Sequence, residues 1–262
     1  MPELPDLEVF RANVFNRLTS KRLIGLDVFN PQKVQESKAI LFNDLVGKEL
    51  LRIDRIGKEL FFDFNDSKII TAHLMLNGAI SIVTTEDAVN NIKYKIFSMT
   101  FEKETVVFSD RGGLCTIKYM PSVSKTPDAF DDSFTVEYFL SKAHGKSRAN
   151  VKAFLIDQNI VKGIGNAYAD EILWSALISP HSLVGKIPDE RLVILYNAIG
   201  TVLKNAIIEI KRISPNAISG EERSFLKVHN KTIKKTETGA SIIVERIASK
   251  ITYYTKEQVL YF

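Results

Sequence analysis

Hydrophobic residues near the start of the chain recur every three or four positions. Leu4, Leu7, Phe10, Val14 and Leu18 would lie on one face of an amphipathic helix over about 3–19. From 22 to about 119, short runs rich in β-branched and aromatic residues, such as "KELFFDF" and "ETVVFSD", are separated by Gly, Asn and Asp. This pattern predicts an antiparallel sandwich or barrel, interrupted by one helical stretch, "VQESKAILFNDLVG".

The second half of the chain has a helical periodicity. The stretch "PSVSKTPDAFDD" (121–132) combines prolines, hydroxyl residues and acids, and predicts a linker. Beyond it we expect a helix capped by Ser133 and ending near 143, a second over about 147–157, and a long one over 188–213. Strand-like runs return after 240, in "SIIV" and "ITYY". The prediction is an α+β protein with a β domain over 1–120, a linker over 121–132, a helical domain over 133–226 and a β-hairpin region over 227–262.

Composition restricts the kinds of site that the chain can carry. The 262 residues have a net charge of +4, which is compatible with a polyanionic partner without requiring one. The single cysteine, Cys115, excludes an internal disulfide and any multi-cysteine metal site, and the four histidines do not cluster. We find no apolar run long enough to span a membrane and no secretory signal, so we expect a cytoplasmic protein.

The stretch "DQNIVKGIGNAYADEILWSALISP" (157–180) predicts two helices joined by a glycine turn. Gly163 and Gly165 allow a tight turn and close approach of a ligand, and the amides that open the second helix favour an anion such as phosphate. Asn166 could cap that helix or donate its amide to the same phosphate. The alternative is a helical hairpin whose glycines serve packing alone.

The opening "MPELPD" raises a chemical possibility. Removal of Met1 would expose the secondary amine of Pro2, and an α-amino group with a pKa of roughly 7.7–8.0 is partly unprotonated at neutral pH. Such an amine can attack an electrophilic carbon and form a Schiff base, with Glu3 beside it as an acid/base. Alternatively, the proline has no role, because chain termini tolerate most residues.

Five stretches together resemble the formamidopyrimidine-DNA glycosylase/endonuclease VIII family, over nearly the whole chain. They are "MPELPDLEV", "RIGKELFF", "AHLMLNG", "PDAFDDSF" and "GIGNAYADEILWSALISP". The resemblance implies an N-terminal antiparallel β-sandwich with flanking helices, followed by a helix–two-turn–helix element. It also implies a bifunctional DNA glycosylase and abasic-site lyase for base-excision repair.

The resemblance assigns roles to residues at matching positions. Pro2 would be the nucleophile, Glu3 the catalytic acid/base, and Lys58 a ligand of the phosphate beside the damaged nucleotide. Asn166, with the turn amides at Gly163 and Gly165, would hold phosphates from the other domain. The partner would be damaged DNA, and the damaged nucleotide would be flipped out of the duplex into a pocket for reaction. The protein would act as a monomer without metal or organic cofactor and, in a prokaryote, associate with the nucleoid.

One departure from the family lies in its C-terminal finger, which normally carries two Cys-x-x-Cys pairs that bind zinc. Non-cysteine residues occupy the four places: Lys235, Thr238, Thr255 and Gln258. We therefore expect a zincless finger, held by apolar packing instead. Where the family places a phosphate-gripping arginine, the chain has Lys250, which either contacts phosphate or is a solvated lysine.

Further departures concern the loops expected to enter DNA. In "SDRGGLC" (109–115), Gly112, Gly113 and Leu114 replace the two arginines and the phenylalanine that fill the gap left by a flipped base in well-known bacterial members. Arg111 could substitute, one position out of register. On the other loop, which also contains His73, Leu76 is either an exposed wedge or a core leucine.

The segment "SPNAISGEERSFLKV" (214–228) is shorter than the base-covering loop of oxoguanine-specific members, which argues against 8-oxoguanine as main substrate. The altered gap-filling loop also leaves an alternative function open. That alternative is a protein that binds damaged or abasic DNA with weak or no glycosylase activity. A ribosomal type of nucleic-acid-binding module is disfavoured by the matching N-terminal half.

Overall fold

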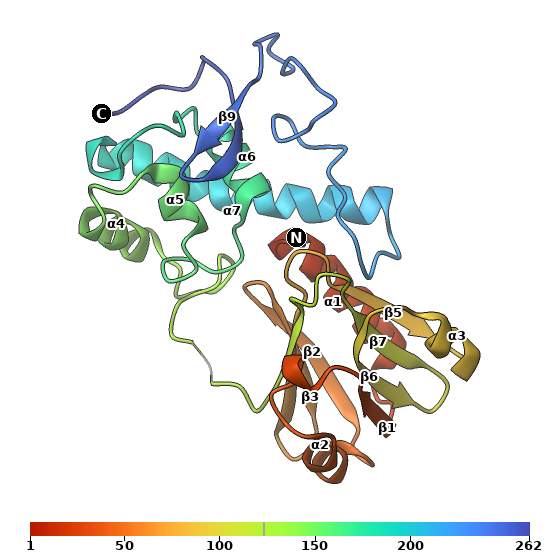
Figure 1. The fold of residues 1–262 in the computed structure, drawn as a ribbon. Helices are drawn as coiled ribbons and strands as arrows, with labels where there is room; N and C mark the ends of the chain where they lie inside the picture. The colour runs from red at the N-terminus through yellow and green to blue at the C-terminus, as the bar shows by residue number, and fades with distance from the viewer. Residues whose placement is uncertain (123) are drawn as a thin grey trace. The chain divides into compact units, whose positions relative to one another are not determined.

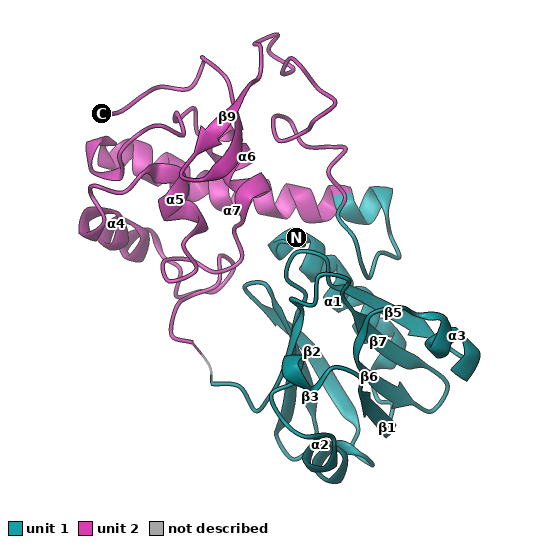
Figure 2. Ribbon diagram, viewed as in Figure 1, with its two compact units in different colours: residues 1–123, 210–221 teal, residues 124–209, 222–262 magenta. Residues whose placement is uncertain are grey.

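A computed structural model of the chain describes all residues except Val123, which falls inside the predicted linker (Figure 1). The chain divides into two compact units (Figure 2). The first comprises residues 1–123 and 210–221, and the second comprises residues 124–209 and 222–262. Each unit is described by itself below.

The first unit is a β-sandwich built from two four-stranded antiparallel sheets. One sheet has the order β1 (Leu23–Val28), β6 (Lys95–Phe101), β7 (Thr105–Ser109), β5 (Ala79–Val83). The other has the order β2 (Leu50–Ile56), β3 (Glu59–Phe64), β4 (Lys68–His73), β8 (Thr116–Tyr119). The helices are α1 (Leu4–Leu18), α2 (Lys38–Leu45), α3 (Glu86–Asn91) and a 3₁₀ turn over Pro31–Lys33. The predicted α+β class with an N-terminal β domain is confirmed.

The inward side chains of both sheets form one apolar core. Phe62 of β3 and Phe108 of β7 meet edge to face, with their ring centroids 5.8 Å apart. Leu7, Phe10 and Val14 of α1 belong to the same core, as their three-to-four spacing predicts. The core therefore fixes the position of the helix that begins at the N-terminus.

The second unit contains four α-helices and a terminal β-hairpin among its described residues. They are α4 (Val136–Gly145), α5 (Val151–Ile156), α6 (Asn166–Ser175), α7 (Asp189–Ile213, whose last turn falls in the first unit), β9 (Ile243–Ile247) and β10 (Lys250–Tyr254), with a 3₁₀ turn over Val184–Lys186. The prediction for the cap of α4 was wrong. The helix is capped by Thr135, whose Oγ1 accepts from the Tyr138 amide at 3.2 Å, whereas Ser133 donates to Asp131.

The longest helix, α7, is the one described helix that is apolar and long enough by composition to cross a membrane. Leu192, Leu195, Ile199 and Leu203 recur along one face of it and are fully or almost fully buried within the protein. Its first turn carries Asp189 and Glu190 and its last turn carries Lys211 and Arg212, and the buried stripe is typical of an amphipathic helix packed against a protein core.

Candidate functional site

The N-terminus of the chain is fixed by the start of α1. Glu3 is the N-cap residue, and it forms a capping box with Asp6, whose Oδ2 accepts from the Glu3 amide at 2.9 Å. Pro5 in the first turn suits a position where no amide donor is needed. Glu3 is only 4% exposed and Pro2 is also buried. The two residues predicted to carry the chemistry therefore sit at an ordered helix start, not on a frayed terminus.

Lys58 occupies the tight turn between β2 and β3. Ile56 pairs with Glu59, which leaves a two-residue connection of Gly57 and Lys58, and Gly57 has φ +62°. A glycine at the first position suits this kind of hairpin. Lys58 is 8% exposed, an unusual burial for a lysine.

An ion-pair cluster ties this turn to α1. Glu8 accepts from Arg11 at 2.6 Å and from Arg55 Nε at 3.1 Å, and Arg55 also donates to the Gly57 carbonyl at 3.0 Å. Burial opposes ionisation of Glu8, but the two arginines outweigh it, so the pKa of Glu8 lies below its usual value. Because Glu8 belongs to α1 and Arg55 to β2, the cluster holds the Lys58 turn against the helix that starts at Glu3.

His73 is the last residue of β4, and Leu76 belongs to the loop that follows it. His73 Nδ1 accepts from the Met75 amide at 3.0 Å, and burial lowers the pKa of the imidazole. Leu76 is 54% exposed whereas Leu74 is 1% exposed, so Leu76 lies at the tip of the loop and not in the core. A Cβ at Gly78 would lie 2.1 Å from the Leu74 carbonyl oxygen, so only glycine closes this loop.

The second predicted DNA loop is organised by one carboxylate. Asp110 is 4% exposed and accepts from the amides of Gly112, Leu114 and Cys115 at 2.6–2.8 Å. Gly113 has φ +61°, so a larger residue would be strained there. Arg111 is exposed beside these residues.

The two predicted DNA loops adjoin each other. A Cβ at Gly112 would lie 3.5 Å from Asn77 Nδ2, in the neighbouring loop. The first unit thus brings together Leu76, Arg111 and the glycines that replace the family's gap-filling arginines.

The second unit contains the glycine turn before α6. Gln158 spans this turn: its Oε1 accepts from the Gly163 amide at 3.0 Å and its Nε2 donates to the Ile164 carbonyl at 2.8 Å. Gly163 has φ +103°, as expected for a glycine-dependent turn. The Gly163 amide therefore already has a side-chain acceptor, contrary to the expectation that it points toward a phosphate.

The proposed capping role of Asn166 was also wrong. Gly165 is the N-cap residue and Asn166 is the first residue of α6. The Asn166 Nδ2 donates to the Ile251 carbonyl at 2.8 Å, so this side chain joins α6 to strand β10.

Lys250 opens β10 and is exposed. The turn before it consists of Ala248 (φ 49°) and Ser249 (φ 64°). Two consecutive non-glycine residues in this region cost about 1–3 kcal/mol each, and such strain often marks functional loops. The pairing of Lys250 with Ile247 fixes the lysine at the end of the hairpin, beside this strained turn.

Hydrogen bonds are present at three of the four positions expected in place of zinc-binding cysteines: Thr238, Thr255 and Gln258. Gln258 Oε1 accepts from the Thr255 amide at 2.8 Å, and its Nε2 donates to the Ile178 carbonyl at 2.8 Å. Thr238 Oγ1 bonds to Glu257 at 2.9 Å and to Thr236 Oγ1 at 2.7 Å. Thr255 is fully buried and Gln258 is 6% exposed. The expected replacement by apolar packing is thus incomplete, because polar side chains perform much of the cross-linking.

The second unit contains a buried charge cluster that the sequence did not predict. Lys152 Nζ and Asp170 Oδ1 are 2.7 Å apart, and both side chains are fully buried. Asp170 Oδ2 also contacts His229 Nδ1 at 2.7 Å and accepts from the Tyr253 amide at 2.9 Å, while Lys152 donates to Thr252 Oγ1 at 2.7 Å. The cluster joins α5, α6 and β10. A lysine and an acid 18 positions apart in helical patterns gave no sequence signal, because such residues usually face solvent.

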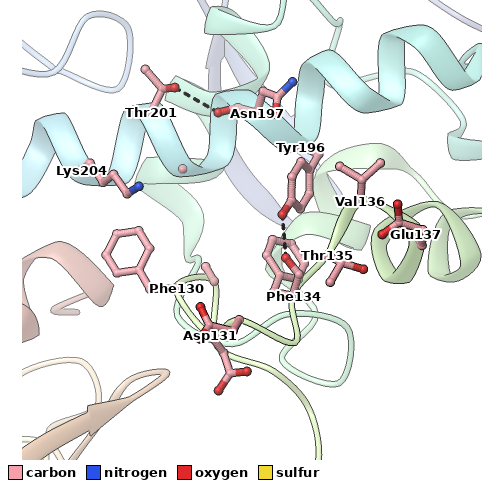
Figure 3. Close-up of a pocket in the computed structure, with 13 residues that line it drawn as sticks. Phe130, Asp131, Phe134, Thr135, Val136, Glu137, Tyr196, Asn197, Thr201 and Lys204 are labelled. Carbon is pink, nitrogen blue, oxygen red and sulfur yellow. Dashed lines mark hydrogen bonds between the residues drawn. The ribbon is translucent and has the colours of Figure 1, made fainter.

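A pocket of about 560 Å³ lies between residues 129–137 and α7 (Figure 3). On one side the Tyr196 hydroxyl donates to the Phe134 carbonyl at 2.7 Å, and Lys204 and Phe130 line the other. Its lining includes none of the predicted site residues. The pocket therefore adds no group to the predicted chemistry.

Two family models match the chain, the formamidopyrimidine-DNA glycosylase N-terminal domain over residues 1–116 and the H2TH domain of the same enzyme over residues 126–216. A formamidopyrimidine-DNA glycosylase of Carboxydothermus hydrogenoformans is 29% identical, with 97% of this chain and 98% of the relative covered. One from Lactococcus lactis subsp. cremoris is 27% identical, with 97% of each covered.

Solved structures agree with these matches. The Lactococcus lactis enzyme in complex with DNA containing an oxidised pyrimidine has a TM-score of 0.85 at 26% identity, covering 97% of this chain and 98% of that one. Its complex with DNA containing an abasic site has a TM-score of 0.85 at 25% identity, covering 97% of each. The two family models match the chain in the order of the two predicted domains, and the relatives span both domains. The chain belongs to the formamidopyrimidine-DNA glycosylase family.

Proposed function

We propose that this protein is a bifunctional DNA glycosylase and abasic-site lyase that removes oxidised bases in base-excision repair. The observation that carries the proposal is the buried, helix-capping start of the chain, Pro2–Glu3, in a member of this family. The relatives solved with oxidised-pyrimidine DNA and abasic DNA support damaged DNA as the partner.

The proposed reaction begins after Met1 is removed. The Pro2 amine attacks C1′ of the flipped nucleotide and the damaged base leaves. Glu3 protonates the ring oxygen, the sugar opens, and an iminium forms between Pro2 and C1′. The iminium acidifies the neighbouring carbon, so the 3′ phosphate and then the 5′ phosphate are eliminated. Glu3 can protonate the ring oxygen because the capping box with Asp6 restricts the position of its carboxyl group.

The remaining predicted residues bind DNA in this proposal. Lys58, Asn166, Lys250, His73, Leu76 and Arg111 keep these roles as predictions. The phosphate ligands, Lys58 and Lys250, would set register and carry no base information. Asn166 would act partly by holding the hairpin, since its amide contacts the Ile251 carbonyl. We also propose a cytoplasmic monomer that needs no metal.

Borohydride trapping on abasic DNA tests the proposal. Wild-type protein should become covalently attached through Pro2, as located by mass spectrometry of the linked peptide. Pro2→Gly should retain some lyase chemistry through a primary amine, whereas Glu3→Gln should bind damaged DNA but release little base. Pro5→Ala is the matched control, because that proline has no free amine. Full activity of a protein that retains Met1 would refute the proposed nucleophile.

The second candidate function is a damaged- or abasic-DNA-binding protein without base release. It is motivated by the loop at Gly112 and Gly113, which offers no side chain to fill the gap left by a flipped base. Tight binding to abasic DNA without trapping would favour this second function.

A further inference from the structure

A second pocket, of about 500 Å³, is lined by α6, α7 and the segment 225–227, all within the second unit. The lining positions recur every three or four residues along each helix, as Tyr168, Glu171 and Trp174 do on α6, so one stripe of each helix faces the pocket. None of the residues predicted for the reaction or for DNA binding lines it. The pocket is therefore separate from the candidate site described above.

Much of the pocket wall is apolar or aromatic. Tyr168, Ala206 and Leu226 are buried, and Phe225 is partly buried beside them. Ile208 also lines the pocket and is 61% exposed, so a bound molecule would cover an apolar side chain that now faces solvent. Small-molecule sites are typically concave, about 300–1,000 Å³ in volume and mostly apolar, with a few polar groups that orient the ligand. The volume and the wall of this pocket fit that description.

Trp174 supplies a hydrogen-bond donor that lacks an acceptor. Its side chain is partly exposed, but its Nε1 atom is buried and no described residue accepts from it. A buried indole N–H usually has a partner, and an unpaired one is unfavourable. Because Nε1 is closed off from solvent, a molecule in the pocket reaches it only if the indole ring turns, and such side-chain adjustments are common on binding. The pocket therefore favours a ligand that carries a hydrogen-bond acceptor.

The charged residues of the lining restrict the kind of acceptor. Glu171 and Glu209 both line the pocket and disfavour an anionic ligand such as a carboxylate. Lys227 does not offset them, because its ammonium is paired with Glu237 at 2.5 Å. A ligand with an ammonium group would suit the two acids, but that group has no acceptor for the indole N–H. A neutral carbonyl oxygen meets both conditions.

We propose that this pocket binds a neutral, planar aromatic molecule whose carbonyl oxygen accepts from Trp174 Nε1. The aromatic ring supplies the apolar area that Phe225 and Ile208 would cover, and the carbonyl oxygen satisfies the donor. The inference concerns a site outside the proposed reaction, so it does not depend on the proposed function.

An NMR titration of the full chain with benzamide tests the inference. Trp174 is the one tryptophan of the chain, so the proton–nitrogen spectrum contains a single indole signal. Benzamide should shift this signal downfield and saturably, because its carbonyl oxygen accepts from the N–H. Benzoate and benzylammonium have a similar size and should bind about tenfold more weakly, the first by charge repulsion and the second for lack of an acceptor. Absence of a saturable shift with benzamide, or equal binding of the three compounds, would overturn the proposal.

Two exposed isoleucines of α7 provide a matched pair of variants. Ile208 lines the pocket whereas Ile194 does not, and exposed positions tolerate substitution with little loss of stability. Ile208→Ala should weaken benzamide binding by about threefold to tenfold, and Ile194→Ala should leave it unchanged. Trp174→Phe keeps an aromatic ring but removes the N–H, so binding followed at the Leu226 amide should weaken by about twofold to tenfold. Equal binding by the two isoleucine variants, or unchanged binding by Trp174→Phe, would contradict the assignment.

Discussion

Replacing Asp170 with Asn should destabilise the second unit strongly. The substitution keeps the size of the side chain but removes the charge that lies 2.7 Å from the fully buried Lys152 ammonium. Removing one partner of a buried pair typically costs about 3–5 kcal/mol, because the other charge stays buried. For a chain of this length each kcal/mol lowers the melting temperature by about 2–4 °C, which predicts a fall of roughly 6–20 °C.

Urea unfolding followed by tryptophan fluorescence measures this loss. Trp174 is the one tryptophan of the chain and belongs to α6, four positions after Asp170, so its signal reports on the second unit. Asp132→Asn removes an exposed acid of the same unit and should change the free energy of unfolding by less than about 0.5 kcal/mol. Equal losses in the two variants would refute the reasoning.

A double substitution separates charge compensation from packing. Lys152→Met with Asp170→Leu replaces both charges by apolar groups of similar size, and such replacements are often neutral or stabilising. The double variant should therefore be more stable than Asp170→Asn. Because the Tyr253 amide donates to Asp170 and leucine has no acceptor, whereas asparagine keeps an oxygen that can accept, hydrogen exchange at the Tyr253 amide should be faster in the double variant than in Asp170→Asn. A double variant that is less stable than the single one would contradict this account.

Three further predictions concern His73, the finger and the DNA loops. Burial lowers the pKa of His73 below the unfolded value of about 6.5, so between these two pKa values the unfolded chain binds more protons than the folded chain. The neutral imidazole therefore contributes fully to the stability of the fold above pH 6.5, and this contribution is lost as the pH falls through the folded pKa. An NMR titration should give a midpoint below 6.5, and a higher midpoint would contradict the assignment. Elemental analysis should find no stoichiometric zinc, because Thr255 and Gln258 form hydrogen bonds at two of the expected ligand positions. Chelators should therefore change neither folding nor activity. One zinc per chain would refute this prediction. Activity should depend little on the base opposite the lesion, because Gly112 and Gly113 have no side chain that can contact that base. Leu76→Ala should lower activity on duplex DNA more than activity on single strands. Single-turnover rates opposite each of the four bases would show a strong preference for cytosine if another residue, such as Arg111, contacts the opposite base.

The elements that depend on local pattern could be predicted from the sequence. The spacing of Leu7, Phe10 and Val14 predicted α1, and alternation with glycine punctuation predicted the sandwich, because burial of one face imposes a period of 3.6 or 2. Helix boundaries were less accurate. Thr135 caps α4 in place of Ser133, since either hydroxyl residue could cap and the choice depends on the Asp131 turn.

The contacts of the candidate site could not be predicted in the same way. The ion pair of Glu221 with the N-terminus joins residues 220 positions apart in the sequence. The Asn166 contact with Ile251 spans 85 positions, and the Lys152–Asp170 pair requires two helices to bury facing charges. Such pairings follow from tertiary packing, which has no period in the sequence. The resemblance supplied residue types for the site but not the partners that hold them.

Two buried carboxylates hold irregular loops in place through backbone amides. Asp110 accepts from three amides of the loop that contains Gly112, and Glu171 accepts from the amides of Lys227, Val228 and His229 at 2.7–2.9 Å. Burial raises the pKa of Glu171, and the three amide donors offset this only in part.

Each of these carboxylates is nearly buried and satisfies backbone donors that a loop would otherwise leave to water. A zinc ion fixes a finger through four side chains, whereas a buried carboxylate fixes a loop through its backbone. Backbone fixation leaves most side chains of such a loop free to vary in type, but not at Gly113, whose φ of +61° favours glycine. Substitutions at Arg111 or Leu114 can therefore change the side chains that the loop exposes while Asp110 preserves its shape.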